Sequence, residues 1–82
     1  RVVQQLVRLA HQHGISDGAA TLIDLRLTQD SLASISGTTR ETVNRVLSGL
    51  RDQGLVQLER ARIRVIDLNR LRTIADIAGH SY

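Results

Sequence analysis

The sequence contains no cysteine, proline, methionine, tryptophan or phenylalanine, and it has a single tyrosine. The absence of cysteine excludes disulfide bonds and thiolate metal sites, as is common in proteins of a reducing compartment. Without large aromatic side chains, a core must be built from leucine, isoleucine, valine and alanine. Such side chains suit small packed helices and short strands, and 82 residues are enough for one small domain.

Long hydrophobic runs are also absent. No apolar stretch approaches the roughly 18 residues that span a bilayer, and no charged and then apolar leader opens the chain. We therefore expect no membrane partner and a cytoplasmic location. The chain begins at Arg1 rather than at a methionine, which suggests a fragment of a longer protein.

Residues suited to catalysis or metal binding are scarce. His11 and His13 lie two apart on a predicted helix, so their side chains point to roughly opposite sides. Ser31, Ser34 and Ser36 have no histidine close in sequence and no Gly-x-Ser-x-Gly turn, and glycine-rich phosphate loops are missing. The sequence therefore predicts that the domain is not an enzyme and that it holds no metal or cofactor of its own.

Positive charge is concentrated in one third of the chain. The net charge is +3, and residues 38–64 hold six arginines against three acidic residues, whereas the remainder is neutral. A basic segment of this kind is typical of a face that binds a polyanion such as nucleic acid. A solvated, arginine-rich face without a partner is the alternative that charge alone leaves open.

Apolar residues at three- and four-residue spacings predict a first helix over about residues 1–13. Gly14 suits the left-handed position that follows many helix ends. From Thr21 to Leu27, apolar and polar residues alternate, which predicts a half-buried strand at the edge of a sheet. The helical stripe consists of Val2, Val3, Leu6, Val7, Leu9 and Ala10.

A short helix is predicted over about residues 29–35. The hydroxyl of Thr28 can cap its first turn. Leu32 and Ala33 would face the core, with Ile35 as a further candidate. The next residues, Ser36 and Gly37, break the helix.

A second helix is predicted over about residues 39–53, directly after this turn. Gly54 closes it, as glycine often does beyond a helix end. Its apolar stripe recurs at positions i, i+3, i+4 and i+7, which indicates one buried face. The stripe consists of Val43, Val46, Leu47 and Leu50.

Two apolar-rich segments, 55–58 and 63–66, predict a small hairpin. The connecting residues 59–62 include neither Gly nor Asn, which tight two-residue turns usually need, so we expect a loop of four residues or more. Asp67 can cap a last helix. That helix would end at Gly79, and its apolar residues are Leu68, Leu71, Ile74, Ala75 and Ala78.

The predicted order is therefore helix, strand, helix, turn, helix, hairpin, helix. Two helices joined by a glycine-containing turn and followed by a hairpin form a winged helix-turn-helix. The expected fold is mainly α with a small β-sheet (α+β), as a single domain over residues 1–82. The helix-turn-helix would occupy about 29–53 and the wing about 55–66, with 39–53 as the recognition helix.

Three stretches resemble the C-terminal domain of the CRP/FNR superfamily of bacterial transcription regulators: Leu27-Thr28-Gln29-Asp30, the run 37–47, and 52–56. The run Arg-Glu-Thr-Val-x-Arg at 40–45 is the most specific part. Ser36 departs from the pattern, since an apolar residue usually precedes the turn glycine. The resemblance implies a domain that binds double-stranded DNA as part of a homodimer. An effector such as a cyclic nucleotide would bind a separate N-terminal domain.

By matching position, the resemblance assigns base reading in a TGTGA-like half-site to Arg40, Glu41 and Arg45. An arginine can donate two hydrogen bonds to guanine, and a carboxylate can accept one from cytosine. Two structural alternatives stand beside this assignment. Thr38 and Glu41 could form a capping box, and Glu41 and Arg45 could form an ion pair along the helix.

Contacts to the DNA backbone are also predicted. Hydroxyls at helix starts and arginines on the wing can bind phosphates and fix the register without reading sequence. The two threonines at helix starts could equally serve as caps. The predicted residues are Thr28, Gln29, Thr39, Thr42, Asn44, Ser48, Arg60 and Arg62, with Arg64 as a further wing cation.

The resemblance further implies contact with RNA polymerase, through residues 14–24. A winged-helix module that docks on protein is the alternative function, because a fold does not fix a function. A docking helix would expose an apolar or aromatic patch, whereas the outer face of 39–53 carries Glu41, Arg45, Ser48 and Asp52. The sequence therefore favours sequence-specific DNA binding.

Overall fold

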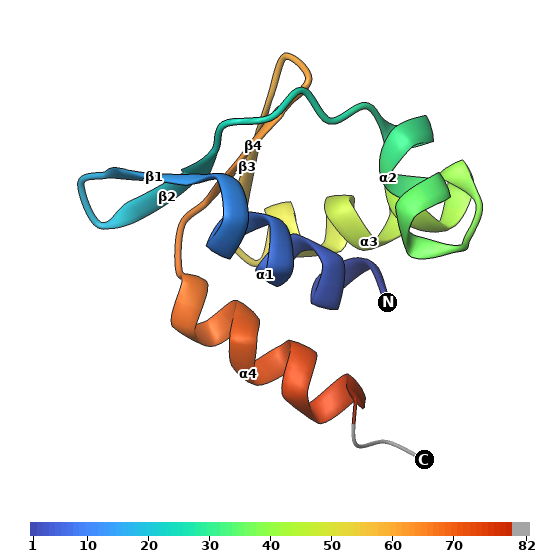
Figure 1. Ribbon diagram of the computed structural model, residues 1–82. Helices are drawn as coiled ribbons and strands as arrows, with labels where there is room; N and C mark the ends of the chain where they lie inside the picture. The colour runs from blue at the N-terminus through green and yellow to red at the C-terminus, as the bar shows by residue number, and fades with distance from the viewer. Residues whose placement is uncertain (80–82) are drawn as a thin grey trace.

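The structure, a computed structural model, describes residues 1–79. Its elements are α1 (Val2–His13), β1 (Gly14–Asp17), β2 (Ala20–Ile23), α2 (Gln29–Ser36), α3 (Arg40–Asp52), β3 (Val56–Glu59), β4 (Arg62–Val65) and α4 (Leu68–Gly79). Helices α2 and α3 are followed by the β3–β4 hairpin, the wing (Figure 1). The predicted winged helix-turn-helix is therefore confirmed. The predicted domain end at residue 82 lies outside the described residues.

The four strands form one antiparallel sheet in the order β1-β2-β4-β3. The prediction of a single edge strand over 21–27 is wrong in two respects. The strand is the shorter β2, and it lies inside the sheet, where Leu22 pairs with Arg64 of β4. The edge strands are β3 and β1, and β1 lacks a buried face that an apolar pattern could have revealed, since all four of its residues are exposed.

Gly14 does not adopt the predicted left-handed conformation. Its φ of −77° and ψ of 138° are extended, and the chain passes directly from α1 into β1. A Cβ at this position would lie 2.1 Å from the carbonyl oxygen of Ala10 and 2.6 Å from Cγ2 of Thr21. Glycine is required here because the chain folds back closely against the end of α1, not because a positive φ is needed.

Helix α2 begins at a capping box and ends at a left-handed glycine. Oγ1 of Thr28 accepts a hydrogen bond from the amide of Ser31, whose Oγ accepts one from the amide of Thr28, both at 3.0 Å. Gly37 has a φ of 68° and passes the chain into the turn. The predicted cap and turn are both confirmed, and together they set the direction in which α3 leaves α2.

The inner face of α2 differs from the prediction at one residue. Leu32 and Ala33 are buried as expected, but Ile35 is exposed. Ser36 is buried instead. The register of a helix explains the exchange: Leu32 and Ala33 project about 100° apart, Ser36 projects between them, and Ile35 projects on the far side of Leu32.

The wing turn is tighter than predicted. Glu59 pairs with Arg62, so only Arg60 and Ala61 lie between the strands. Ala61, the second of these two residues, has a positive φ of 55°. The carbonyl of Ala61 also accepts a hydrogen bond from the amide of Leu27, which ties the wing tip to the segment before α2.

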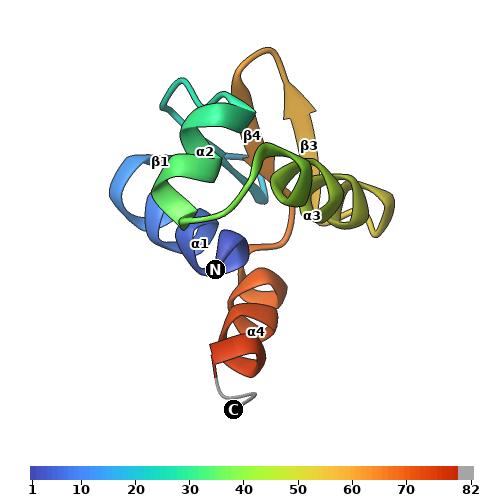
Figure 2. The same ribbon diagram turned by 90° about the vertical axis from the view of Figure 1, so that its right-hand side faces the viewer.

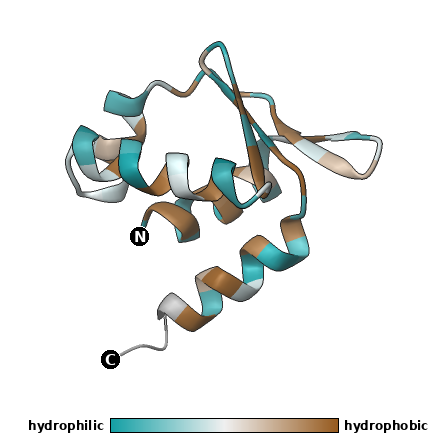
Figure 3. Ribbon diagram, turned by 180° about the vertical axis from the view of Figure 1, so that it is seen from behind, coloured by the Kyte–Doolittle hydropathy of each residue, from teal (hydrophilic) through white to brown (hydrophobic). Residues whose placement is uncertain are grey.

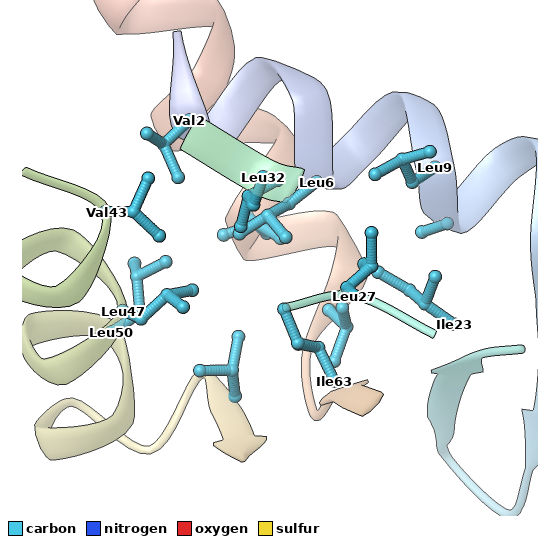
Figure 4. Close-up of a cluster of buried hydrophobic side chains, with 14 of the residues drawn as sticks. Val2, Leu6, Leu9, Ile23, Leu27, Leu32, Val43, Leu47, Leu50 and Ile63 are labelled. Carbon is cyan, nitrogen blue, oxygen red and sulfur yellow. The ribbon is translucent and has the colours of Figure 1, made fainter. Parts of the chain in front are cut away.

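The core lies between α1, α3 and the sheet. Figure 4 shows Leu6 of α1, Leu32 of α2 and Leu47 of α3 converging on one apolar cluster with the strand residue Ile63. Helix α4 is capped by Asp67, whose Oδ1 accepts from the amide of Arg70 at 3.1 Å, and it packs mainly against α1. No other element of residues 1–79 covers the outer face of α3.

Candidate nucleic-acid interface

The buried side chains of α3 determine which of its side chains point away from the core. Val43, Leu47 and Leu50 are buried against the core, which turns Glu41 and Arg45 outward, where both residues are exposed. Thirteen residues make a helix about 20 Å long, a size that a DNA major groove admits. Figure 2 shows α3 lying beside α2, with the wing rising next to it.

Neither structural alternative for Glu41 is found. The N-cap of α3 is Thr39, whose Oγ1 accepts from the amide of Thr42 at 3.2 Å, so the structure does not contain the alternative capping box from Thr38 to Glu41. Within residues 1–79, no ion pair engages Glu41 or Arg45. Both side chains are therefore available to an external partner.

Two helix starts lie close together beside this face. Thr28 caps α2 and Thr39 caps α3, so the capping alternative is confirmed for both. A helix start presents free amide groups and a partial positive charge, which suits a phosphate. The hydroxyl of Thr39 also lies 3.1 Å from that of Thr42. Caps and phosphate contacts can coexist, because a hydroxyl donates one hydrogen bond and accepts others.

Side chains of α2 and α3 are joined by a chain of polar contacts. Nε of Arg40 donates to Oε1 of Gln29 at 3.2 Å, and Nε2 of Gln29 donates to Oδ1 of Asn44 at 3.2 Å. Nη1 of Arg40 lies 3.7 Å from Oδ2 of Asp30. Pattern-based reasoning missed these links, since the partners are 11 and 15 residues apart and belong to different helices.

A hollow of about 270 Å³ separates the start of α2 from the wing. Its floor is apolar, with Leu32 and Leu47 from the helices and Leu58 and Ile63 from the wing. Thr28, Gln29 and Arg62 are among its polar lining residues. The wing therefore stands off from the helix pair across a shallow depression, as a separate point of contact on the same side.

The wing arginines differ in their surroundings. Arg62 lies 3.4 Å from Asp24, while Arg64 lies between Asp17 and Glu59, at 3.1 and 3.0 Å. Arg60 makes no ion pair in the part of the chain that the structure describes. Figure 3 shows the wing tip as hydrophilic.

Arg64 is thus mainly a structural residue. Its side chain is 28% exposed, and its two carboxylate partners come from the end of β1 and the end of β3. Arg62 keeps a side chain that is 52% exposed. Of the predicted wing cations, Arg60 and Arg62 are the ones that stay accessible to a phosphate. Sequence reasoning did not single out Arg26, which lines a small surface hollow with these two arginines.

Within residues 1–79, no group of three or more metal-ligating side chains is found. No helix in the same range has the length and apolar character needed to cross a membrane. The polar groups of the described surface that could contact a partner lie on the outer face of α3, at the two capped helix starts and at the wing tip.

Known proteins with similar sequences and structures also contain this helix-turn-helix arrangement. The family model of the Crp-like helix-turn-helix domain matches residues 1–74. The chain is 37% identical over 71 residues to a CRP-like cAMP-activated global transcriptional regulator of Mycobacterium tuberculosis, covering 87% of this chain and 32% of that protein. It is 36% identical over 67 residues to the global nitrogen regulator of Synechococcus elongatus, covering 82% and 30%.

Similar solved structures include oxidized CprK in complex with o-chlorophenolacetic acid. That structure superposes with a TM-score of 0.85 at 26% identity, over 93% of this chain and 32% of the CprK chain. The chain thus spans about a third of the length of the relatives it matches. Both sequence relatives are regulators, and the mycobacterial one is a transcriptional regulator, in keeping with the prediction of a non-enzymatic domain.

Proposed function

Because the chain belongs to the Crp-like helix-turn-helix domains of the CRP/FNR superfamily, we propose that it places α3 in the DNA major groove and reads a TGTGA-like half-site. The observation that carries the proposal is the outer face of α3. That face is polar, uncovered by the rest of the described chain, and flanked by two helix starts and a basic wing tip.

Three residues of α3 read bases in this proposal. Arg40 and Arg45 each donate two hydrogen bonds to O6 and N7 of a guanine, and Glu41 accepts one from N4 of a cytosine. Arg40 and Glu41 lie in the first turn of α3, the part of a recognition helix that reaches deepest toward base edges. Arg45 lies one turn after Glu41 on the same exposed side.

The backbone contacts surround this reading face. Hydroxyl and amide groups at the two helix starts bind phosphates, together with polar residues of α3 and arginines of the wing. These contacts set affinity and register, whereas the α3 residues set sequence preference. The proposed contacts are Thr28, Gln29, Thr39, Thr42, Asn44, Ser48, Arg60 and Arg62.

The whole protein is proposed to act as a homodimer. Two heads would engage half-sites about one helical turn, roughly 34 Å, apart. A ligand bound outside this domain would change the population of dimers whose heads can reach both half-sites; a cAMP-activated protein is among the relatives. RNA polymerase would contact residues 14–24, which include β1, whose four residues are all exposed. A regulator of this kind acts in the cytoplasm.

Docking on another protein is the competing function. It would require an apolar patch on α3, as protein interfaces are anchored by buried apolar and aromatic side chains. The exposed large hydrophobic residues of the described chain lie elsewhere, at Ile15, Ile35, Leu58 and Ile77. The surface of α3 therefore favours DNA.

A titration of the 15N-labelled chain with a TGTGA duplex at low salt, followed by amide chemical shifts, tests the proposal. The expected shifts cluster on residues 40–48, the start of α2 and the wing turn, with little change on α4. Shifts that instead spread over α4, or no shifts at low salt, would contradict the proposed docking of α3.

A further inference from the structure

We propose that Gln29 positions Arg40 for reading one guanine, as a buttress from the neighbouring helix. The inference rests on the proposed base-reading function and adds to it a residue that sets specificity without touching a base edge. Three observations carry it: the Arg40 Nε to Gln29 Oε1 hydrogen bond, the Gln29 Nε2 to Asn44 Oδ1 hydrogen bond, and the proximity of Asp30 to Arg40.

Only the end of the Arg40 guanidinium stays free to contact a base. A guanidinium can face a guanine with its side edge, through Nε and Nη2, or with its end, through Nη1 and Nη2. Gln29 occupies Nε, which removes the side edge. Asp30 lies 3.7 Å from Nη1, a long exposed contact that leaves N–H bonds of that nitrogen available. Arg40 is therefore directed toward an end-on contact.

The side chain of Gln29 is itself held at both ends of its amide group. A glutamine side chain has three rotatable bonds, and a contact at one end alone would leave its amide free to turn. Here the amide oxygen is fixed by Arg40 and the amide nitrogen by Asn44. Gln29 stands at the first position of α2, and the Thr28 capping box fixes that turn of the backbone. The cluster thus links the start of α2 to the first two turns of α3.

The contact with Gln29 lowers the entropic cost of ordering Arg40 when it binds a base. A long side chain loses rotamer freedom when it binds a base, and any order already present in the free protein reduces that cost. The side chain of Arg40 is 66% exposed, so little else in the described chain restrains it. Gln29 therefore supplies order that would otherwise have to be gained on binding.

This role differs measurably from a simple phosphate contact. A phosphate contact adds the same affinity on every sequence. A buttress acts through Arg40 and so affects the preference at the base pair that Arg40 reads and at no other. Both roles can belong to Gln29, but only the second changes the specificity profile.

The test is a panel of duplexes that carries every single base-pair substitution of the half-site. Binding of the 82-residue chain is compared with that of Arg40→Ala, Gln29→Ala and the control Gln12→Ala, an exposed glutamine on α1. We expect Arg40→Ala to abolish the preference at one base pair. Gln29→Ala should reduce the preference at that same base pair by about 2- to 10-fold, the effect of one net hydrogen bond, and Gln12→Ala should match the parent chain.

A uniform loss of affinity in Gln29→Ala, with an unchanged profile, would overturn the buttress and leave the DNA-reading function intact. No change of profile in Arg40→Ala would instead reject the base-reading role of Arg40 and the buttress with it. Gln29→Glu provides a further check, because a carboxylate still accepts from Nε of Arg40 and can also accept from Nδ2 of Asn44 once that amide turns. It should keep the preference while weakening binding to all duplexes through charge repulsion, and a loss of preference equal to that of Gln29→Ala would contradict the assignment.

Discussion

The arginines on the proposed DNA-binding side differ in what surrounds each guanidinium. Arg45 projects from the middle of α3 and makes no ion pair within residues 1–79, whereas Arg62 lies on the wing beside Asp24. A base-reading residue contributes to one sequence, and a phosphate-binding residue contributes to all of them. These two arginines therefore provide a direct comparison of the two roles.

Arg45→Ala is expected to weaken binding to a TGTGA duplex by about 1–3 kcal/mol and binding to a shuffled duplex by much less. Arg62→Ala should weaken both by a similar factor and reduce the dependence of affinity on salt. Equilibrium titrations of both variants on both duplexes measure the difference. If the two variants lose affinity in the same proportion on each duplex, Arg45 does not read bases.

The close packing around Gly14 predicts how one substitution changes stability. Gly14→Ala should lower the free energy of unfolding by about 1–3 kcal/mol, as overpacking usually does, because the added Cβ would meet the carbonyl of Ala10. Chemical denaturation measures the change. Gly49→Ala is the matched control: nothing lies within 4 Å of its added Cβ, and alanine is the better helix former, so this variant should be more stable. An unaltered midpoint for Gly14→Ala would refute the close approach.

At the scale of elements, the wing hairpin depends on one strained residue. Ala61 holds a positive φ, which costs a residue with a side chain roughly 1–2 kcal/mol relative to glycine. Glycine loses part of this advantage through its larger entropy in the unfolded chain. The strain is retained at the tip of the proposed DNA-contacting wing.

Ala61→Gly is therefore expected to stabilise the domain by about 0.5–1 kcal/mol, raising Tm by a few degrees. Ala19→Gly, in the β1–β2 turn and without a positive φ, should have no effect or a slight destabilising one. Thermal unfolding of the two variants measures both. If Ala61→Gly is no more stable than Ala19→Gly, the positive φ of Ala61 is contradicted.

The helices could be predicted from sequence, because their apolar stripes repeat at helical spacing and their caps are local. The bounds of α3 are within one residue of the expectation, and Thr28, Gly37 and Asp67 act as local chemistry dictates. The sheet was harder. β1 has no buried residue, and the alternation over 21–27 misled because Leu25 and Leu27 reach the core from beyond the strand.

The candidate site was predictable in part for the same reason. The exposure of Glu41 and Arg45 follows from the stripe on the opposite side of α3. The links from Gln29 to Arg40 and Asn44 do not, because they depend on how α2 and α3 cross in space. The ion pairs of Arg62 and Arg64 likewise depend on sheet pairing that brings β2 against β4.

At the scale of the whole molecule, folding redistributes charge. The basic segment 38–64 looks isolated in sequence, yet Asp17, Asp24 and Asp30 from outside it lie against its arginines. Fewer arginines than the sequence indicates therefore lack an acidic partner; within residues 1–79, those of the basic segment are Arg45 on α3 and Arg60 at the wing tip. Sequence preference, more than overall charge, should distinguish the correct DNA site from others.

The most direct test of this account is a fluorescence anisotropy titration at low and moderate salt. The 82-residue chain is titrated against a duplex with TGTGA and TCACA half-sites in inverted repeat and against a shuffled duplex of the same composition. A single head binds weakly, so the ratio of the two affinities is the informative quantity. The account predicts tighter binding to the inverted repeat at both salt concentrations. Equal, salt-sensitive affinities for the two duplexes would contradict reading of this half-site by Arg40, Glu41 and Arg45.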